Sequence, residues 1–300
     1  MHQQYDESAK VHLDRDATGV ARNLLHVDEV FVSSARTAQL AAREYLEKFG
    51  PTLGLKLDEL NHIGLRPERR PTDVGVEYRF LQETSQFDAT TVTFSQTCLG
   101  LPVWEAGLAV HILQNPFRVI GAQSTAHLGI EVARPAEKAL KAIAPVSEET
   151  LARRLGLSEK DDEFDRASLK IERQQLYVYR YEKDKRVRQV EVPQAGETRA
   201  EGEDRERKNG HDHVHLIPIP PLPPVPKEIA EGGHYVLAAV YFKLGAKQIP
   251  ELRWVALVET QTQAVLLLRA FIESMDGLVF VQDPMTTDGG PRIARAGSHR

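Results

Sequence analysis

The sequence predicts an α+β fold made of two subdomains, each a helix followed by an antiparallel sheet. The first observation is an amphipathic helix pattern over residues 34–49, followed by short segments in which apolar and polar residues alternate. The second is a return of the same order, with short helices at 135–143 and 147–155 and strands from about residue 169. The third is a charged and proline-rich insertion at about 183–233, which we expect to be disordered because it lacks the apolar residues of a core.

The first helix has recognisable ends. Ser34 is a candidate N-cap, and the apolar residues from Ala38 to Phe49 follow helical spacing along one stripe. Gly50 and Pro51 then stop the helix. Four alternating segments follow and predict a meander: 76–80, 92–98, 106–112 and 117–120.

The second half repeats the plan with an interruption. Pro135 suits a first helical position, and Ser147 caps the next helix, which Gly156 closes. Residues 218–226 read PIPPLPPVP, which indicates a stiff spacer and, as an alternative, a ligand for a domain that reads polyproline helices. The predicted strands are 176–181, 234–244, 252–259 and 264–270.

These patterns divide the chain into four parts. We expect a weakly patterned N-terminal segment at 1–32 and a first domain at 33–130. A second domain follows at 131–282 and carries the insertion. Residues 283–300 are predicted to be a disordered tail.

Composition limits the class of protein. Of 300 residues, 41% are hydrophobic and 27% are charged, which is typical of a soluble globular protein with room for two modest domains. The formal net charge is −5, whereas nucleic acid binding calls for a basic face. The longest apolar runs, such as 235–242, are too short to span a bilayer. We therefore expect neither a nucleic acid nor a membrane partner.

Residues 94–113 read FSQTCLGLPVWEAGLAVHIL and resemble the FTP domain, the propeptide module of fungalysin- and thermolysin-type zinc metalloproteases. The helix at 34–49 stands where that family has one. Cys98 departs from the family, which usually has an aromatic residue there. The positions that match the family motif are Gln96, Thr97, Gly100, Leu101, Pro102 and Val103.

The second half is similar to a PepSY-like region, so the resemblance implies two cystatin- or PepSY-like subdomains. The helix at 135–143 and the strand with Trp254, Val255 and Val258 match that pattern, and 259–263 stand at its acidic turn. Gln263 replaces the family's glycine, and the insertion has no counterpart in the family.

The resemblance implies a non-catalytic pro-segment that inhibits a protease domain and assists its folding. The implied partner is a zinc metalloprotease domain, in cis or in trans, or another protein. We predict that Trp104 and Glu105, with the strand at 106–113, contribute to the binding surface. For Trp104 the alternative is a strand residue that closes one end of the core.

The catalytic motif of these proteases is missing from the sequence. None of the eleven histidines is followed by glutamate, so there is no His-Glu-x-x-His zinc motif, and we expect no enzymatic activity and no cofactor. His211, His213 and His215 alternate and form a weak alternative metal site, although a polar loop is the favoured interpretation. The single cysteine, Cys98, excludes an intrachain disulfide and is expected to be a small buried hydrophobe.

Two other functions stay open at this point. The chain could be a stand-alone interaction or structural module of a larger assembly. It could also be the N-terminal fragment of a protease zymogen, because residues 277–290 resemble the junction after a propeptide. The family is usually secreted, but the polar N-terminus shows no signal peptide, so the sequence leaves the compartment open.

Overall fold

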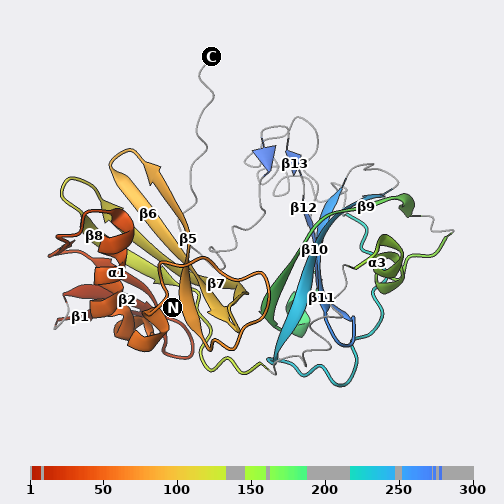
Figure 1. The fold of residues 1–300 in the computed structure, drawn as a ribbon, viewed down its shortest axis with the longest axis horizontal. Coiled ribbons are helices and arrows are strands. Elements are labelled where there is room, and N and C mark those ends of the chain that lie inside the picture. The colour runs from red at the N-terminus through yellow and green to blue at the C-terminus, as the bar shows by residue number, and fades with distance from the viewer. Residues whose placement is uncertain are drawn as a thin grey trace, which may run out of the picture. The chain divides into compact units, whose positions relative to one another are not determined.

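The structure is a computed structural model whose two compact units are described separately (Figure 1). One unit comprises Met1–Ile130 with Gln282–Arg300, and the other comprises Glu131–Val281. The described residues are 2–7, 10–132, 146–159, 163–187, 217–246, 252–271, 273–274 and 277–278.

The first unit is an antiparallel sheet with the strand order β1-β2-β3-β8-β7-β6-β5, and β4 also pairs with β8. Helix α1 (Ala38–Phe49) lies against one face of this sheet, and the short 3-10 helices η1 (Gly50–Leu53) and η2 (Leu57–Leu60) follow it. The strands are β1 (His2–Asp6), β2 (Val11–Arg15), β3 (Ala21–His26), β4 (Phe31–Val32), β5 (Glu77–Gln86), β6 (Ala89–Cys98), β7 (Leu101–Leu113) and β8 (Arg118–Ser124).

Helix α1 confirms the predicted apolar stripe. Its buried residues include Ala41, Tyr45 and Leu46, which pack into the core of the first unit. The N-cap is Thr37 rather than Ser34, and the Thr37 side chain accepts a hydrogen bond from the backbone N–H of Leu40 at 3.3 Å. The N-cap of the helix therefore lies three residues after Ser34, the N-cap predicted from the sequence.

His26 of β3 is buried beside this helix. Its Nε2 lies 3.1 Å from the Tyr45 hydroxyl and its Nδ1 lies 2.9 Å from the Glu29 carbonyl oxygen. Burial lowers the pKa of His26 below its ordinary 6.5; the Lys48 ammonium also lowers it, while the bond to the Glu29 carbonyl opposes the change. The folded protein therefore holds this imidazole neutral at pH values where the unfolded chain protonates it.

This arrangement predicts acid destabilisation near neutral pH. Below about pH 6.5 the His26 imidazole is protonated in the unfolded chain but stays neutral in the folded chain. The free energy of unfolding should therefore fall as the pH drops through that value. His26 alone should change the free energy of unfolding by at most about 1.4 kcal/mol per pH unit. Burial also lowers the pKa of His111 and of His234, and the Arg180 guanidinium lowers the pKa of His234 further, so both residues add to the effect.

Urea unfolding at about pH 7.5 and 5.5 measures this dependence. His26→Gln should reduce the loss, whereas His12→Gln, at an exposed position of β2, should leave it unchanged. A wild-type free energy of unfolding that is equal at both pH values would contradict the assignment.

The second unit is a four-stranded antiparallel sheet in the order β9-β10-β11-β12. Helix α3 (Glu148–Arg154) begins at the predicted N-cap Ser147, and its Leu151 joins a core that contains Phe242 and Trp254. The other elements are β9 (Phe164–Arg180), η3 (Lys183–Lys185), β10 (His234–Ala246), β11 (Arg253–Glu259), β12 (Val265–Phe271), β13 (Glu273–Ser274) and β14 (Gly277–Leu278).

The described part of the predicted insertion is packed rather than disordered. Ile217 is 2% exposed within the core of the second unit. The Arg186 guanidinium donates a hydrogen bond to the Pro223 carbonyl oxygen at 2.5 Å. Gly156 has a φ of +75°, and a Cβ there would lie 2.3 Å from the Pro221 carbonyl oxygen. The proline run is therefore part of the second unit's packing and not a free spacer.

The predicted α+β class, with two helix-plus-sheet subdomains, was wrong, while residues 188–216 of the predicted insertion lie outside the described residues. Twelve strands, β1 to β12, dominate the described residues, while α1 and α3 have 12 and 7 residues, so the chain is closer to all-β. One reason is that 1–32, which lack a strong pattern, supply β1, β2 and β3. The predicted helix at 135–143 lies outside the described residues.

Candidate functional site

The hairpin that joins β6 to β7 carries the motif found in the sequence. Cys98 pairs with Leu101 across a two-residue turn, in which Leu99 has a φ of +54° and Gly100 a φ of +73°. Positive φ at both central residues matches the twist of hairpin strands. The Gly100 carbonyl oxygen accepts a hydrogen bond from the Glu68 N–H at 2.7 Å. A Cβ on Gly100 would lie 2.7 Å from the Thr72 Oγ1, so a glycine is needed where the loop 61–76 meets the turn.

Gln96 and Thr97 bind neighbouring segments from inside the sheet. The Gln96 side chain donates to the His127 carbonyl oxygen and accepts from the His127 N–H, both at 2.8 Å. The Thr97 hydroxyl donates to the Glu77 carbonyl oxygen at 3.2 Å. Gln96 is 1% exposed and Thr97 is fully buried. Leu101, Pro102 and Val103 are buried as well, so the six motif positions have structural contacts.

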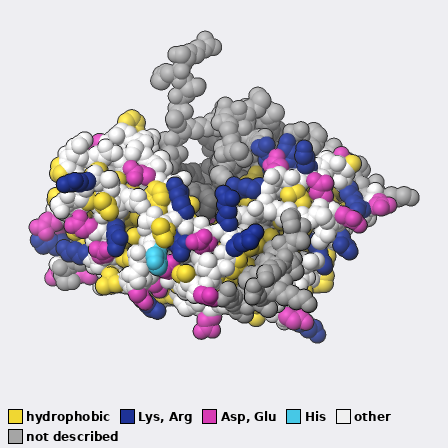
Figure 2. Space-filling view, in the orientation of Figure 1, with side chains coloured by type: hydrophobic (Ala, Val, Ile, Leu, Met, Phe, Trp, Pro, Cys, Tyr) yellow, Lys and Arg dark blue, Asp and Glu magenta, His cyan; other side chains and the backbone are white. Residues whose placement is uncertain are grey.

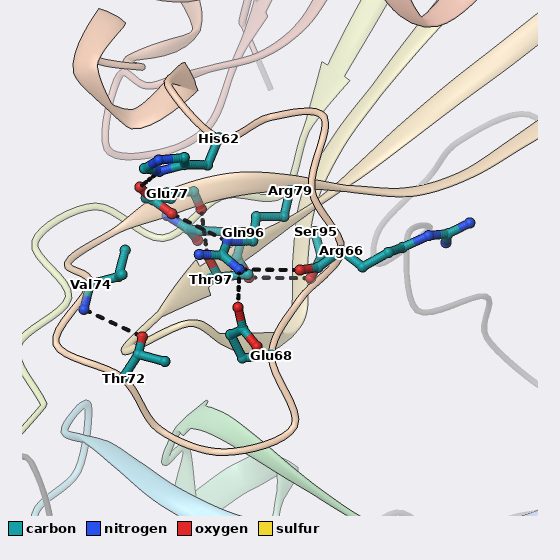
Figure 3. A network of polar contacts seen from close by, with 10 residues as sticks. All are labelled: His62, Arg66, Glu68, Thr72, Val74, Glu77, Arg79, Ser95, Gln96 and Thr97. Atoms are coloured by element: carbon teal, nitrogen blue, oxygen red, sulfur yellow. Dashed lines mark hydrogen bonds and ion pairs between the residues drawn. The ribbon is translucent and has the colours of Figure 1, made fainter.

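Four charged or titratable side chains meet beside this hairpin (Figure 3). The Arg79 Nε donates to the Glu77 Oε2 at 3.2 Å, and the Arg79 Nη1 donates to the Glu68 Oε1 at 2.9 Å. The His62 Nδ1 lies 2.5 Å from the Glu77 Oε1. Arg79 is 3% exposed and Glu77 is 7% exposed, so the pair is almost completely removed from water.

The polar network fixes the loop 61–76 against β5. Arg79 and Glu77 belong to the strand, whereas His62 and Glu68 belong to the loop. A buried ion pair adds little stability compared with apolar packing, but it strongly disfavours arrangements in which one charge loses its partner. The network therefore selects one position of the loop on the strand.

Strand β5 is an open edge beyond the loop. Among the strands that the structure describes it pairs only with β6, and all residues from Leu81 to Gln86 are exposed. Leu81 is a bulge residue, since Phe80 pairs with Phe94 and Gln82 with Thr93. Arg66 donates to the Leu81 carbonyl oxygen, and its guanidinium lies 4.6 Å from the centre of the Phe80 ring. Arg66 therefore closes the inner part of the edge and leaves the outer part open.

Two further arginines of the loop, Arg69 and Arg70, are exposed, and no ion pair reaches them within the described part of the chain. Figure 2 shows basic, acidic and hydrophobic side chains mixed over the visible face, without a large field of one sign.

The structure places Trp104 and Glu105 in β7, the strand between β6 and β8. Trp104 is 9% exposed, and Glu105, with a φ of +56°, is partly exposed within a bulge. The strand at 106–113 pairs with β6 on one side and β8 on the other, so its backbone offers no open edge. The role of both residues in binding stays a prediction.

The open β5 edge was not found from the sequence. Its signal is the segment LQETSQ, which lacks the apolar alternation of a half-buried strand and therefore indicates exposure on both faces.

Other candidate residues have ordinary surroundings or lie outside the described residues. Cys98 is buried, and burial raises the pKa of its thiol, as expected for a small buried side chain. His211, His213 and His215 lie outside the described residues. Within the described ranges, no group of three or more His, Cys, Asp or Glu side chains could hold a metal ion. No described helix is long and apolar enough to cross a membrane.

The acidic turn of the second unit is closed by Glu259. This carboxylate, 4% exposed, accepts hydrogen bonds from the Thr262 N–H at 2.6 Å and the Thr262 hydroxyl at 2.7 Å. Gln263 follows with a φ of +57°, a conformation that favours glycine. The position where the resemblance puts a glycine therefore has a glycine-like backbone.

Comparison of the chain with protein-family models finds no match, and comparison with curated proteins finds none either. The class defined by the fold and the site is a strand-rich protein with an ordered loop beside an open edge strand.

Proposed function

We propose that the chain is a non-catalytic, propeptide-like module that binds the catalytic domain of a thermolysin- or fungalysin-type zinc metalloprotease. The observation that carries the proposal is the open outer edge of β5, next to the hairpin whose sequence resembles the propeptide module. An exposed edge strand can pair with an extended segment of a partner, whose backbone supplies the affinity.

The site is suited to strand addition because it is fixed before binding. The polar network holds the loop, and Arg66 marks the end of the available edge at Leu81. A partner strand would run along Gln82–Gln86 without rearrangement of this hairpin. Each new backbone hydrogen bond contributes about 0.5–1.5 kcal/mol net, and the preformed edge keeps the entropic cost of association low.

Inhibition is the direct test of this proposal. The purified chain should inhibit thermolysin at about micromolar concentration or below and should have no effect on a chymotrypsin-type serine protease. An unfolded sample of the same chain is the control, because it shows how much inhibition arises when the chain merely competes with the assay substrate for cleavage. The proposal fails if the folded chain neither binds nor inhibits thermolysin or a fungalysin-type protease.

Reversing the charges of the two exposed arginines in the loop 61–76 should weaken binding. The double variant Arg69→Glu/Arg70→Glu should reduce the affinity for thermolysin by about tenfold, mainly through slower association, because exposed basic side chains steer a partner surface of opposite charge. The effect should shrink at high salt.

The double variant Arg36→Glu/Lys183→Glu is the matched control, because it makes the same change in net charge at exposed positions elsewhere. Equal binding by the two double variants, measured by surface plasmon resonance at two salt concentrations, would rule out a specific role for the loop arginines.

A further inference from the structure

The tip of the β5–β6 hairpin carries an aromatic side chain that the fold leaves in water. Gln86 pairs with Ala89 across the two-residue loop Phe87–Asp88. Phe87 is 95% exposed, the highest value among the exposed large hydrophobic residues of the described chain. A single exposed hydrophobe is ordinary, so exposure alone would carry no conclusion.

The backbone at Phe87 supplies a second, independent observation. Its φ is +56°, at the first position of a two-residue hairpin loop, where glycine is the usual residue. A bulky residue in this conformation is a genuine outlier because its Cβ crowds the backbone. Phe87 therefore combines a backbone penalty with an exposed ring, and neither favours the fold.

The hairpin tip is held firmly despite its exposure. The Gln114 N–H of the β7–β8 turn donates to the Asp88 carbonyl oxygen at 2.9 Å. Ser85 and Thr90 lie across the hairpin with their hydroxyl oxygens 3.0 Å apart, and the Gln114 side chain donates to the Thr90 hydroxyl at 2.5 Å. The backbone that carries the Phe87 ring is therefore already ordered, so less conformational entropy is lost when a partner binds.

We propose that Phe87 is an anchor residue that inserts into an apolar pocket of the partner protease domain. This inference rests on the proposed function, because β5 is also the strand whose edge the partner would occupy. The rigid aromatic side chain supplies a large contact area, as anchor residues at the centre of interfaces do.

The negative charge at the hairpin tip indicates which kind of pocket would accept Phe87. Asp88 is next to the ring and Glu83 lies on the same hairpin, both exposed. A pocket with a basic rim complements these carboxylates, whereas the surface of an anionic bilayer attracts basic segments instead. The occupant is therefore a protein pocket rather than a lipid surface.

Three variants test the anchor with thermolysin as the probe. Phe87→Gly should raise the inhibition constant by at least about 30-fold and should also raise the melting temperature, because it relieves the positive φ. Loss of binding in a more stable protein cannot come from unfolding. Phe87→Tyr keeps the ring and should stay within about threefold of the wild type. Leu40→Ala, which trims a 51% exposed side chain on α1, is the control and should bind normally.

Each outcome separates the two proposals. If the wild-type chain inhibits thermolysin and Phe87→Gly inhibits it equally well, the anchor is refuted while the proposed function stands. If the wild-type chain binds neither thermolysin nor a fungalysin-type protease, the proposed function is refuted, and so is the assignment of a protease pocket to Phe87. Binding of the wild-type chain, but not of Phe87→Gly, to phosphatidylserine vesicles would replace the protein pocket by a lipid surface.

Discussion

Replacing Arg79 with methionine should lower the free energy of unfolding by about 3–5 kcal/mol. Methionine keeps the apolar stem, but the Glu77 carboxylate, 9% exposed as a side chain, loses its strand partner. The variant also removes the hydrogen bonds from Arg79 to Glu68 and to the Arg66 carbonyl oxygen. Removal of one partner from a buried ion pair is costly because the other charge stays away from water. Urea unfolding at neutral pH measures the loss.

Two further variants show whether the loss of stability in Arg79→Met comes from the broken ion pair or from changed packing. Arg43→Met breaks an exposed pair with Glu47 on α1 and should cost only about 0.3–0.5 kcal/mol. The double variant Glu77→Gln/Arg79→Met also removes the buried charge of Glu77, leaving only the half-exposed Glu68 without its partner, and should recover part of the loss. The account of the polar network is wrong if Arg79→Met is as mild as Arg43→Met.

Gly107→Ala should destabilise the first unit by about 2–4 kcal/mol. A Cβ on Gly107 would lie 2.2 Å from the Phe94 carbonyl oxygen, which belongs to the backbone of the neighbouring strand and cannot rotate away. The strands β6 and β7 would have to separate next to the bulge, where Ser95 pairs with Gly107. Thermal and urea unfolding of the purified variant test this expectation.

Gly75→Ala is the matched control for this change. A Cβ on Gly75 would meet nothing within 4 Å, and its φ lies outside the left-handed region. This variant should be neutral or should stabilise the protein by about 0.4–1 kcal/mol, because alanine restricts the unfolded chain. Equal effects of the two variants would mean that the close approach at Gly107 does not limit the fold.

The strongest local patterns in the sequence predicted individual elements well. The stripe from Ala38 to Phe49 became α1, and the alternating segments became β6, β7 and the β10–β12 meander. The class of the fold was missed because β2 alternates over only five residues and carries His12 and Asp14 on its outer face. Such a short, polar strand is recognised only by its pairing with β3.

The candidate site was only partly accessible to the same reasoning. The motif at Gln96 and Thr97 marked the correct hairpin, but periodicity does not show that its polar atoms bind His127 and Glu77. The edge position of β5 depends on strand order, which is a long-range property that no local pattern encodes. The positive φ of Phe87 was likewise hidden, since glycine is the residue that normally signals it.

Hydrogen exchange of the complex tests the central claim, that a metalloprotease domain binds at the β5 edge, most directly. The chain would be mixed with a catalytically inactive thermolysin variant, and the exchange of its backbone amides followed by mass spectrometry. We expect the peptide that spans Gln82–Gln86 to gain protection, while amides of β7, already paired on both sides, stay unchanged. Unchanged exchange in β5, with or without protection elsewhere in the chain, would contradict the account.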